Sequence, residues 1–535
     1  MTPSVFIVAA AFAAGVQATT APVPCAVTVN TTSASPIPPT FAGFGWEMYA
    51  MLSFMPHMND TRFATAARGL APALLRVGGI TADWVRYVGM DGAPPRAAGA
   101  RAQLPPHAPA LGGYWPTAPV NLTARGDFAA LLSFARAANF SLMFTLNELY
   151  GRNCNATKPG CPTCDDWCVG PWDTSNVRAF LQYIHDEGLF GTPGALHSFE
   201  LGNELVFHQF ANDTVADIVA LAGIIQDVWA DTPTTSRPLL YAPSTDDCTD
   251  AAQLEIMANI TGVAGVGGFT FHGYPGQSGA GADSLASILL NSTWLRERIM
   301  TGSNAVGCLD AWNAGPRARG LELLVTESSS SWAWNLPPPA QNSFIHGFFT
   351  VAELGQYATR GVSAVARWAL TEGSPFATIA FNASRGPAGG WDAAADYFIL
   401  AAHKRAVGAA ALRSTFDPAS GALVYAACGP ARNGSVALSA VNPTLAPVTL
   451  SVADAAGAPL APAPRLAYVF TAPGGPGDLA SLTPMLNGGA ALRLADDGTP
   501  PPIEPVFVGG GAIVLPPRSQ AFFVLLDARA PACGA

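Results

Sequence analysis

The sequence predicts an α/β fold: a (β/α)8 TIM barrel followed by a C-terminal β-sandwich, with an N-terminal strand that joins the sandwich. Short apolar runs alternate with segments of helical apolar spacing up to about residue 410, the pattern of parallel β-α-β units. There are eight such runs, as a closed barrel requires. From about Ala411 onward, only short strand-like runs separated by turn residues remain, which indicates a sandwich.

Each predicted barrel strand is an apolar run that ends in polar residues or glycine. The eight runs are Phe41–Tyr49, Leu74–Gly79, Leu142–Asn147, Ser198–Glu204, Leu239–Ser244, Gly268–Tyr274, Leu321–Ser328 and Ala364–Leu370. The predicted helices between them include Asp127–Ala138, Thr174–Glu187, Ala216–Ala230 and Ser343–Thr359. No glycine-rich phosphate motif follows the first strand, so a dinucleotide-binding sheet is disfavoured.

The remaining segments predict a sandwich domain after the barrel and an insertion within it. The predicted sandwich strands are Leu423–Ala427, Ser435–Val441, Val448–Val452, Arg465–Phe470, Ala490–Leu494, Ala512–Leu515 and Ala521–Leu526, with Cys25–Thr31 as an additional strand. Val88–Pro119 is rich in Pro, Ala and Gly and is expected to be a surface insertion. We therefore predict a signal peptide over residues 1–18, an N-terminal strand and linker over 19–40, the barrel over 41–410 and the sandwich domain over 411–535.

Composition excludes some classes of partner. The chain of 535 residues has 50% apolar and 12% charged residues, enough apolar material for a large core. Its net charge of −10 argues against binding to nucleic acid or to a dense polyanion.

The N-terminus predicts entry into the secretory route. Val5–Gly15 is apolar and is followed by Val16-Gln17-Ala18, where small residues fit a cleavage site. The apolar run is too short to span a bilayer. Glycosylation sequons fit the same route and lie at Asn30, Asn59, Asn121, Asn139, Asn155, Asn212, Asn259, Asn291, Asn382 and Asn433. We expect a secreted protein, or one in the lumen of the secretory-lysosomal route. Membrane or matrix association stays open, without a transmembrane segment.

The nine cysteines suggest disulfides in such a compartment. Four of them crowd one loop, and either a zinc knuckle or disulfides could explain them; we expect disulfides. These four are Cys154, Cys161, Cys164 and Cys168. Cys428 and Cys533 are placed to close the last module. Cys25, Cys248 and Cys308 remain, and the odd total leaves at least one thiol without a partner within the chain.

Two segments predict the chemistry. Phe199–Glu204 and Leu323–Ser328 are apolar, strand-like runs that deliver Glu204 and Glu327. Active sites of parallel barrels lie at the C-terminal ends of the strands, so glutamates from the fourth and seventh strands can face each other. A pair of carboxyl groups is what hydrolysis of a glycosidic bond needs.

The chain resembles the heparanase and β-glucuronidase relatives of glycoside hydrolase family 79. The resemblance rests on an ordered set of motifs that spans nearly the whole mature chain. These are Leu75–Gly79, Phe144–Asn147, Phe199–Glu204, Phe271–Tyr274, Thr326–Ser329, Asp396–Phe398, Lys404–Gly408, Leu486–Gly488 and Ala521–Val524. In such glycosidases the acid/base and the nucleophile follow the fourth and seventh strands. The Cys428/Cys533 pair is similar to the disulfide of that family's sandwich.

The resemblance implies a role for each matching residue. Glu204 would be the general acid/base and Glu327 the nucleophile, and no metal or other cofactor is implied. The implied substrate-binding residues are Asn203, which would hydrogen-bond the sugar 2-hydroxyl, together with Tyr274, His272, Arg76 and Trp334. For several of these a purely structural role is the alternative: a packed histidine for His272, a core aromatic for Tyr274, loop packing for Trp332 and Trp334, and a buried ion pair for Arg76. Asp83 and Glu148 are expected on the surface or behind the site.

Some positions depart from the family. The glycine run after the nucleophile, whose backbone helps to hold a uronic carboxylate, is here Ala333-Trp334-Asn335. Phe376 stands where a tyrosine assists it, Arg367-Trp368 replaces an Arg-Gln pair, and Leu205 replaces a proline. We expect a secreted retaining β-glycosidase, a heparanase-like β-glucuronidase. The alternatives are a hydrolase of a neutral β-glycoside on the same barrel and a non-catalytic glycan-binding protein.

Overall fold

A computed structural model describes residues 21–534, apart from the segments 92–118, 157–166, 192–195, 206–208, 247, 277–284, 303–304, 334–340, 372–374, 386–388 and 461–462. The predicted signal peptide and most of the predicted insertion Val88–Pro119 lie outside the described residues. Short strands β4 (Val85–Val88) and β5 (Val120–Thr123) pair with each other on either side of that insertion.

Eight parallel strands close into a barrel, which confirms the predicted fold class. Around the barrel the order is β10-β11-β12-β13-β2-β3-β6-β9. The bounds are β2 Ala42–Glu47, β3 Ala73–Gly78, β6 Phe140–Leu146, β9 Leu196–Leu201, β10 Leu239–Thr245, β11 Val266–Gly273, β12 Glu322–Ser328 and β13 Ala364–Trp368. Each of these strands overlaps one of the eight predicted runs.

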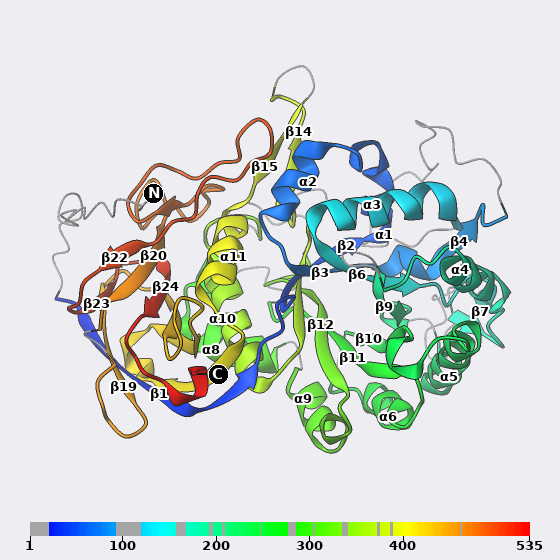
Figure 1. The fold of residues 1–535 in the computed structure, drawn as a ribbon, viewed down its shortest axis with the longest axis horizontal. Helices are drawn as coiled ribbons and strands as arrows, with labels where there is room; N and C mark the ends of the chain where they lie inside the picture. Colours follow the sequence, from blue (N-terminus) through cyan, green and yellow to red (C-terminus); the bar gives the residue numbers. More distant parts are fainter. Residues whose placement is uncertain are drawn as a thin grey trace.

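Helices surround the barrel (Figure 1). The main ones are α2 Thr61–Arg68, α3 Ala129–Ala138, α4 Ser175–Asp186, α5 Ala211–Val228, α6 Ala251–Ile260, α8 Ser292–Thr301, α9 Ala305–Asn313, α10 His346–Arg360 and α11 Ala395–Ala406. The four predicted helices correspond to α3, α4, α5 and α10. Shorter helices are α1 Met48–Ser53 and α7 Leu285–Leu289. A hairpin of β14 (Ile379–Asn382) and β15 (Gly390–Ala393) stands between β13 and α11.

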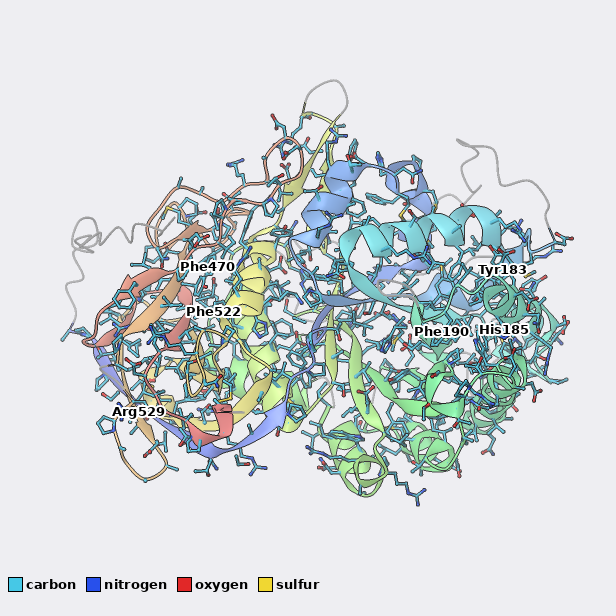
Figure 2. The ribbon with its side chains drawn as sticks, viewed as in Figure 1. Tyr183, His185, Phe190, Phe470, Phe522 and Arg529 are labelled. Atoms are coloured by element: carbon cyan, nitrogen blue, oxygen red, sulfur yellow. A yellow bond between two sulfur atoms is a disulfide. The ribbon has the colours of Figure 1, made fainter. Side chains whose placement is uncertain are left out.

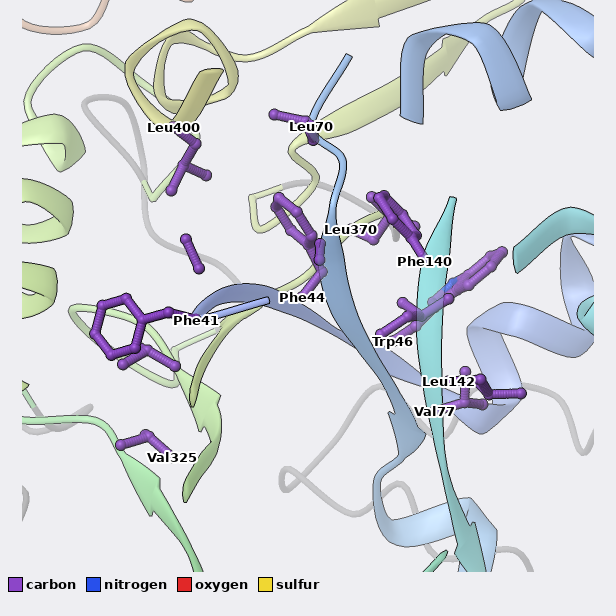
Figure 3. Close-up of a cluster of buried hydrophobic side chains, with 14 of the residues drawn as sticks. Phe41, Phe44, Trp46, Leu70, Val77, Phe140, Leu142, Val325, Leu370 and Leu400 are labelled. Carbon is purple, nitrogen blue, oxygen red and sulfur yellow. The ribbon is translucent and has the colours of Figure 1, made fainter. Parts of the chain in front are cut away.

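Strand alternation divides the barrel residues between two environments. On β3, Leu75 and Val77 face outward and join the large buried cluster under the helices, together with Trp46 and Phe140 (Figure 3). Leu74 belongs instead to a separate cluster inside the barrel, with Met143, Tyr241, Leu324 and Ala364. Arg76, two residues further on, faces inward as well. The barrel interior is therefore apolar in its lower layer and charged above it, toward the C-terminal ends of the strands.

The C-terminal strands form one continuous ten-stranded sheet that β1 joins as predicted. β1 (Val23–Pro36) pairs antiparallel with β16 (Ala410–Phe416) and parallel with β19 (Val448–Asp454). The remaining strands are β17 Leu423–Cys428, β18 Val436–Asn442, β20 Arg465–Thr471, β21 Met485–Leu486, β22 Val506–Val508, β23 Ile513–Leu515 and β24 Ser519–Leu525. Residues from both ends of the sheet meet in one buried cluster, so the sheet folds over itself as a sandwich.

One predicted sandwich strand is wrong. Ala490–Leu494 is not a strand, and only Ala491 forms an isolated bridge, with Met485. One edge of β20 pairs with β24. Its other edge pairs with β21 at one end and with β22 at the other. A further strand beside β20 would therefore compete with β21 and β22 for the same edge.

Aromatic side chains join the sandwich to the barrel. Phe470 on β20 and Phe522 on β24 are fully buried and lie beside α11 (Figure 2). The ring centroid of Phe522 is 6.0 Å from that of His403 on α11. Both phenylalanines belong to the same buried cluster as the residues under the barrel helices, so the two parts share a core.

Three disulfides are present among the described cysteines: Cys154–Cys168, Cys248–Cys308 and Cys428–Cys533. The first agrees with disulfides rather than zinc in the cysteine-rich loop, although Cys161 and Cys164 lie outside the described residues. The third is the predicted closing pair of the sandwich. Cys25 is buried as a free thiol.

Removing the closing disulfide is expected to destabilise the protein. Cys428 and Cys533 are 105 residues apart, and a loop of this length restrains the unfolded chain by up to about 4–5 kcal/mol in the entropic account. The double variant Cys428→Ser/Cys533→Ser should therefore unfold at lower denaturant concentration. Cys25→Ser, which removes only the unpaired thiol, is the matched control. Equal unfolding midpoints for both variants, or a free Cys533 in peptide mapping, would contradict the prediction.

Across the described ranges, no helix has both the length and the apolar character needed to cross a membrane.

Candidate active site

The two predicted catalytic glutamates meet at the C-terminal end of the barrel. Glu327 is on β12 and is 6% exposed. Glu204 was predicted to end the fourth strand, and this detail is wrong, because β9 stops at Leu201. The chain turns there because Gly202 and Glu204 take left-handed backbone conformations, with φ of 63° and 52°. Such a φ is uncommon for a non-glycine residue and is held by its surroundings.

Neighbouring segments of the barrel hold this turn. The backbone N–H of Asn203 donates to Asp83 Oδ1 at 3.1 Å. The backbone N–H of Glu204 donates to the carbonyl oxygen of Ser244, at the end of β10, at 3.0 Å. Two successive residues of the turn are thus fixed by the segment after β3 and by the end of β10, and the Glu204 side chain is directed toward β11 and β12.

Arg76 organises the charged layer beneath the two glutamates. Its guanidinium donates to Glu200 Oε2 and Asn203 Oδ1 at 2.7 and 2.8 Å, and it also pairs with Glu327 Oε1. The side chain is fully buried, so it acts on these groups rather than on a sugar. Burial opposes its charge, but Glu200 and Glu327 raise the pKa of Arg76. Arg76 is therefore a permanent cation in contact with the Glu327 carboxylate.

His272 links the acid/base candidate to the barrel interior. Its Nδ1 lies 2.6 Å from Glu204 Oε1 and its Nε2 lies 3.0 Å from Ser244 Oγ. Burial alone would lower the pKa of His272, but the charge of Glu327 and the hydrogen bond to Glu204 raise it. Because the ring is buried and engaged on both sides, His272 positions Glu204.

Tyr274 and Glu327 form the other half of the site. The Tyr274 hydroxyl donates to Glu327 Oε2 at 2.8 Å, while Arg76 holds the other carboxylate oxygen. One oxygen of Glu204, one of Glu327 and one nitrogen of His272 all lie within 4.8 Å of one another. The geometry thus presents two carboxyl groups side by side, one with two donors and one with an imidazole partner.

Glu204, His272 and Glu327 lie close enough together to hold a metal ion. In the described part of the chain, no other three Asp, Glu, His or Cys side chains have this spacing. Each member is already engaged: Glu327 by Arg76 and Tyr274, Glu204 by His272, and His272 by Ser244. A positive guanidinium in contact with Glu327 also opposes a cation there. The arrangement is suited to acid/base and nucleophilic chemistry.

Asp83 and Glu148 both lie fully buried behind the Gly202–Glu204 turn. Burial raises the pKa of Asp83, although its hydrogen bond from Asn203 opposes the shift. Burial also raises the pKa of Glu148, as does neighbouring Asp217. The surface alternative is therefore wrong for both residues, and they support the turn from behind.

Other predicted residues are less central or fall outside the described part. Trp334 and Asn335 belong to the segments that the structure does not describe, whereas Trp332 is 47% exposed. Arg367 points away from the glutamates and donates to Asp396 Oδ2 at 2.7 Å. Leu205 packs with Leu149 and Cys168.

Sequence reasoning missed three members of the site. Glu200 Oε2 accepts from Arg76 and from Thr145 Oγ1, the latter at 2.8 Å. Ser244 Oγ accepts from Arg76 at 3.0 Å. Although burial opposes it, the charge of Arg76 lowers the pKa of Glu200. A glutamate between Phe199 and Leu201 inside an apolar strand is itself a signal, because a buried carboxylate requires a partner.

The chain is similar over most of its length to known proteins. Hyaluronoglucuronidase of Hirudo nipponia is 23% identical over 480 residues, which cover 87% of this chain and 89% of that protein. Heparanase of Mus musculus is 24% identical over 533 residues, with coverage of 90% and 88%. The crystal structure of a 4-O-α-L-rhamnosyl-β-D-glucuronidase from Fusarium oxysporum 12S has the same fold, with a TM-score of 0.60 and 16% identity over 94% of this chain and 100% of that one.

The family itself is identified by a sequence model of the glycosyl hydrolase family 79 N-terminal domain. The model matches residues 41–355, which is more than half of the chain and includes seven of the eight barrel strands and both candidate catalytic glutamates. This protein belongs to glycosyl hydrolase family 79.

Proposed function

We propose that this protein is a secreted, retaining β-glycoside hydrolase that cleaves β-glucuronosides. The observation that carries the proposal is the pair of Glu204 and Glu327, with oxygens no more than 4.8 Å apart. Retaining glycosidases have carboxyl groups about 5–5.5 Å apart, whereas inverting ones need about 6.5–9.5 Å to admit a water molecule. The assembled pair also weighs against a non-catalytic glycan-binding protein.

In the first step Glu204 gives its proton to the glycosidic oxygen while the bond from that oxygen to the anomeric carbon breaks. A carboxylate oxygen of Glu327 forms a bond to the same carbon, and the alcohol leaves. Arg76 and Tyr274 each hold one oxygen of Glu327 and orient the carboxylate for the attack. Because Asn203 Oδ1 accepts from Arg76, its amide nitrogen is the part that can donate to a sugar hydroxyl.

In the second step a water molecule attacks the anomeric carbon and Glu204, now a carboxylate, takes the proton of that water. The bond to Glu327 breaks and restores the free carboxylate. Two inversions leave the β configuration unchanged. His272, with a raised pKa and a hydrogen bond to Glu204, stabilises the charge that Glu204 carries between the steps.

Family membership and the name of the Hirudo nipponia relative, a hyaluronoglucuronidase, support a β-glucuronoside as substrate. One observation favours a neutral β-glycoside as the second candidate. Phe376 is buried with Trp368 and Ala369, and Tyr274 packs against this cluster. An apolar wall beside the partner of Glu327 suits a sugar without a charged substituent.

The secreted part of the proposal rests on the sequence of residues 1–18 and on the three disulfides. Disulfides persist mainly in oxidising compartments, which include the extracellular space and the lumen of the secretory route.

The expected result is hydrolysis with retention. Proton NMR of the sugar that first forms from an aryl β-glucuronoside should show the β anomer before mutarotation. The values of kcat/KM for the aryl β-glucuronoside and for the β-glucoside, β-xyloside and β-galactoside of the same aryl alcohol should be compared. This comparison distinguishes a β-glucuronidase from a hydrolase of neutral β-glycosides. An α anomer as first product would reject the mechanism. If none of these glycosides is hydrolysed, the proposal that the protein is a β-glycoside hydrolase is wrong.

A further inference from the structure

The ends of β11 and β12 are joined by a side-chain bridge that the mechanism does not use. The pairing of these strands shifts between Phe271 and His272, just before the residues that carry the chemistry. Past the shift, the Ser328 hydroxyl donates to the carbonyl oxygen of Gly273 at 3.1 Å. Ser328 follows Glu327, and Gly273 lies between His272 and Tyr274. The backbone N–H of Ser329 donates to the same carbonyl oxygen at 3.2 Å, so the side-chain bridge adds a second tie between the strand that carries the nucleophile and the strand whose residues orient both glutamates.

Glu353, on α10 behind the barrel, completes this bridge. Its Oε1 forms a hydrogen bond with Ser328 Oγ, and the residue is 3% exposed. A serine hydroxyl has one proton to donate. If that proton is given to Gly273, the hydrogen bond between Ser328 and Glu353 exists only when Glu353 carries its own proton and donates it. The bridge therefore requires a neutral Glu353.

The surroundings of Glu353 agree with a neutral acid. Burial raises the pKa of Glu353 to about 8, although Ser328 and the charge of Arg367 oppose the shift. Arg367 is itself paired with Asp396 at 2.7 Å, which also lies 3.4 Å from His346. The other charged or titratable groups on α10 and on the elements around it are His272, Arg296, Glu297, Arg298, Glu322, Glu327, Tyr357, Arg360, Tyr397, His403, Lys404, Arg405, Arg413 and Tyr425.

We propose that Glu353 is a positioning residue, which as a neutral acid holds the Ser328–Gly273 bridge closed and so fixes Glu327 relative to His272 and Tyr274. Loss of its proton turns Glu353 into an acceptor. Ser328 then donates to Glu353 and releases Gly273, and a buried negative charge appears behind the nucleophile. Loss of the Glu353 proton therefore lowers the activity at alkaline pH, independently of the protonation of Glu204. This inference rests on the proposed function for its activity readout.

The test is the pH dependence of kcat/KM on a 2,4-dinitrophenyl β-glycoside, from pH 6 to 9. This leaving group needs no proton, so loss of the proton on Glu204 does not limit the first step. For the wild type, kcat/KM at pH 9 should be about a tenth of its value at pH 6, as expected one unit above a pKa of about 8. Glu353→Gln can donate to Ser328 at every pH, and its ratio of the two rates should stay close to one.

Two further variants keep the test decisive. Ser328→Ala removes the bridge itself, so its kcat should be low at all pH values and its alkaline fall should be absent. Glu297→Gln changes an exposed glutamate on α8 and should keep the wild-type ratio. Thermal melts at each pH establish that every variant is folded. If Glu353→Gln and Ser328→Ala both fall with pH as the wild type does, the proposal is overturned. Failure of the proposed function would appear differently, as a wild type without turnover at any pH.

Discussion

Glu327→Gln is expected to abolish turnover on every glycoside that the wild type cleaves. The amide keeps the shape of the side chain but lacks the charge and nucleophilicity needed to form the covalent intermediate. Arg76 would also lose one of its two anionic partners, keeping Glu200, and Tyr274 would lose its acceptor carboxylate. The loss in kcat should exceed about 10⁴-fold, beyond what is typical of general acid/base residues.

The measurement is kcat on a good and on a poor leaving group, with a matched control on the same strand. Glu322 begins β12 at the opposite end of the barrel and accepts from the Tyr241 hydroxyl at 2.5 Å. Glu322→Gln should reduce stability at most and leave kcat within a few-fold of the wild type. Comparable losses in both variants would mean that damage to β12, rather than loss of a nucleophile, explains the result.

Azide gives an independent identification of the nucleophile. In Glu327→Ala, azide can enter the space of the missing carboxylate, bond to the anomeric carbon from the α face and displace the alcohol. The product would be an α-glycosyl azide, with inverted configuration. A β-glycosyl azide from this variant would assign the nucleophilic role to a different residue.

The barrel and its two glutamates could be predicted because they depend on local pattern. Apolar runs of strand length mark the eight strands, and a carboxylate at the end of such a run marks the catalytic end of the barrel. Helical spacing marked the predicted helices for the same reason, although α5 begins at Ala211, five residues before the predicted Ala216. Thr174–Glu187 was predicted, and α4 is Ser175–Asp186.

The contacts that complete the site depend on the register between strands and on how helices pack against them. The local pattern of apolar residues does not contain this information. Glu353 lies on a predicted helix, but its contact with Ser328 requires the strand shift after Phe271. The pairing of Arg367 with Asp396 likewise depends on how α11 packs against β13. The left-handed turn at Glu204 is fixed by Asp83 and Ser244, which are distant in sequence.

Glu204→Gln should slow hydrolysis in a way that depends on the leaving group. A poor leaving group, such as a sugar hydroxyl, needs the proton that Glu204 supplies, and its kcat/KM should fall by about 10²–10⁴-fold. A dinitrophenolate leaves without a proton, so its kcat/KM should change much less. The glycosyl intermediate would then accumulate, because the water of the second step has lost its general base.

Rescue by azide distinguishes this role from simple misfolding. In Glu204→Ala, azide needs no base to attack the intermediate on Glu327, so it should accelerate turnover of the dinitrophenyl glycoside and give a β-glycosyl azide. His272→Gln is the matched comparison, because it keeps Glu204 but removes its imidazole partner, which lies 2.6 Å away. That variant should be slowed on poor leaving groups without gaining from azide. Equal losses on both leaving groups in Glu204→Gln, together with no response of Glu204→Ala to azide, would show that Glu204 is not the acid/base.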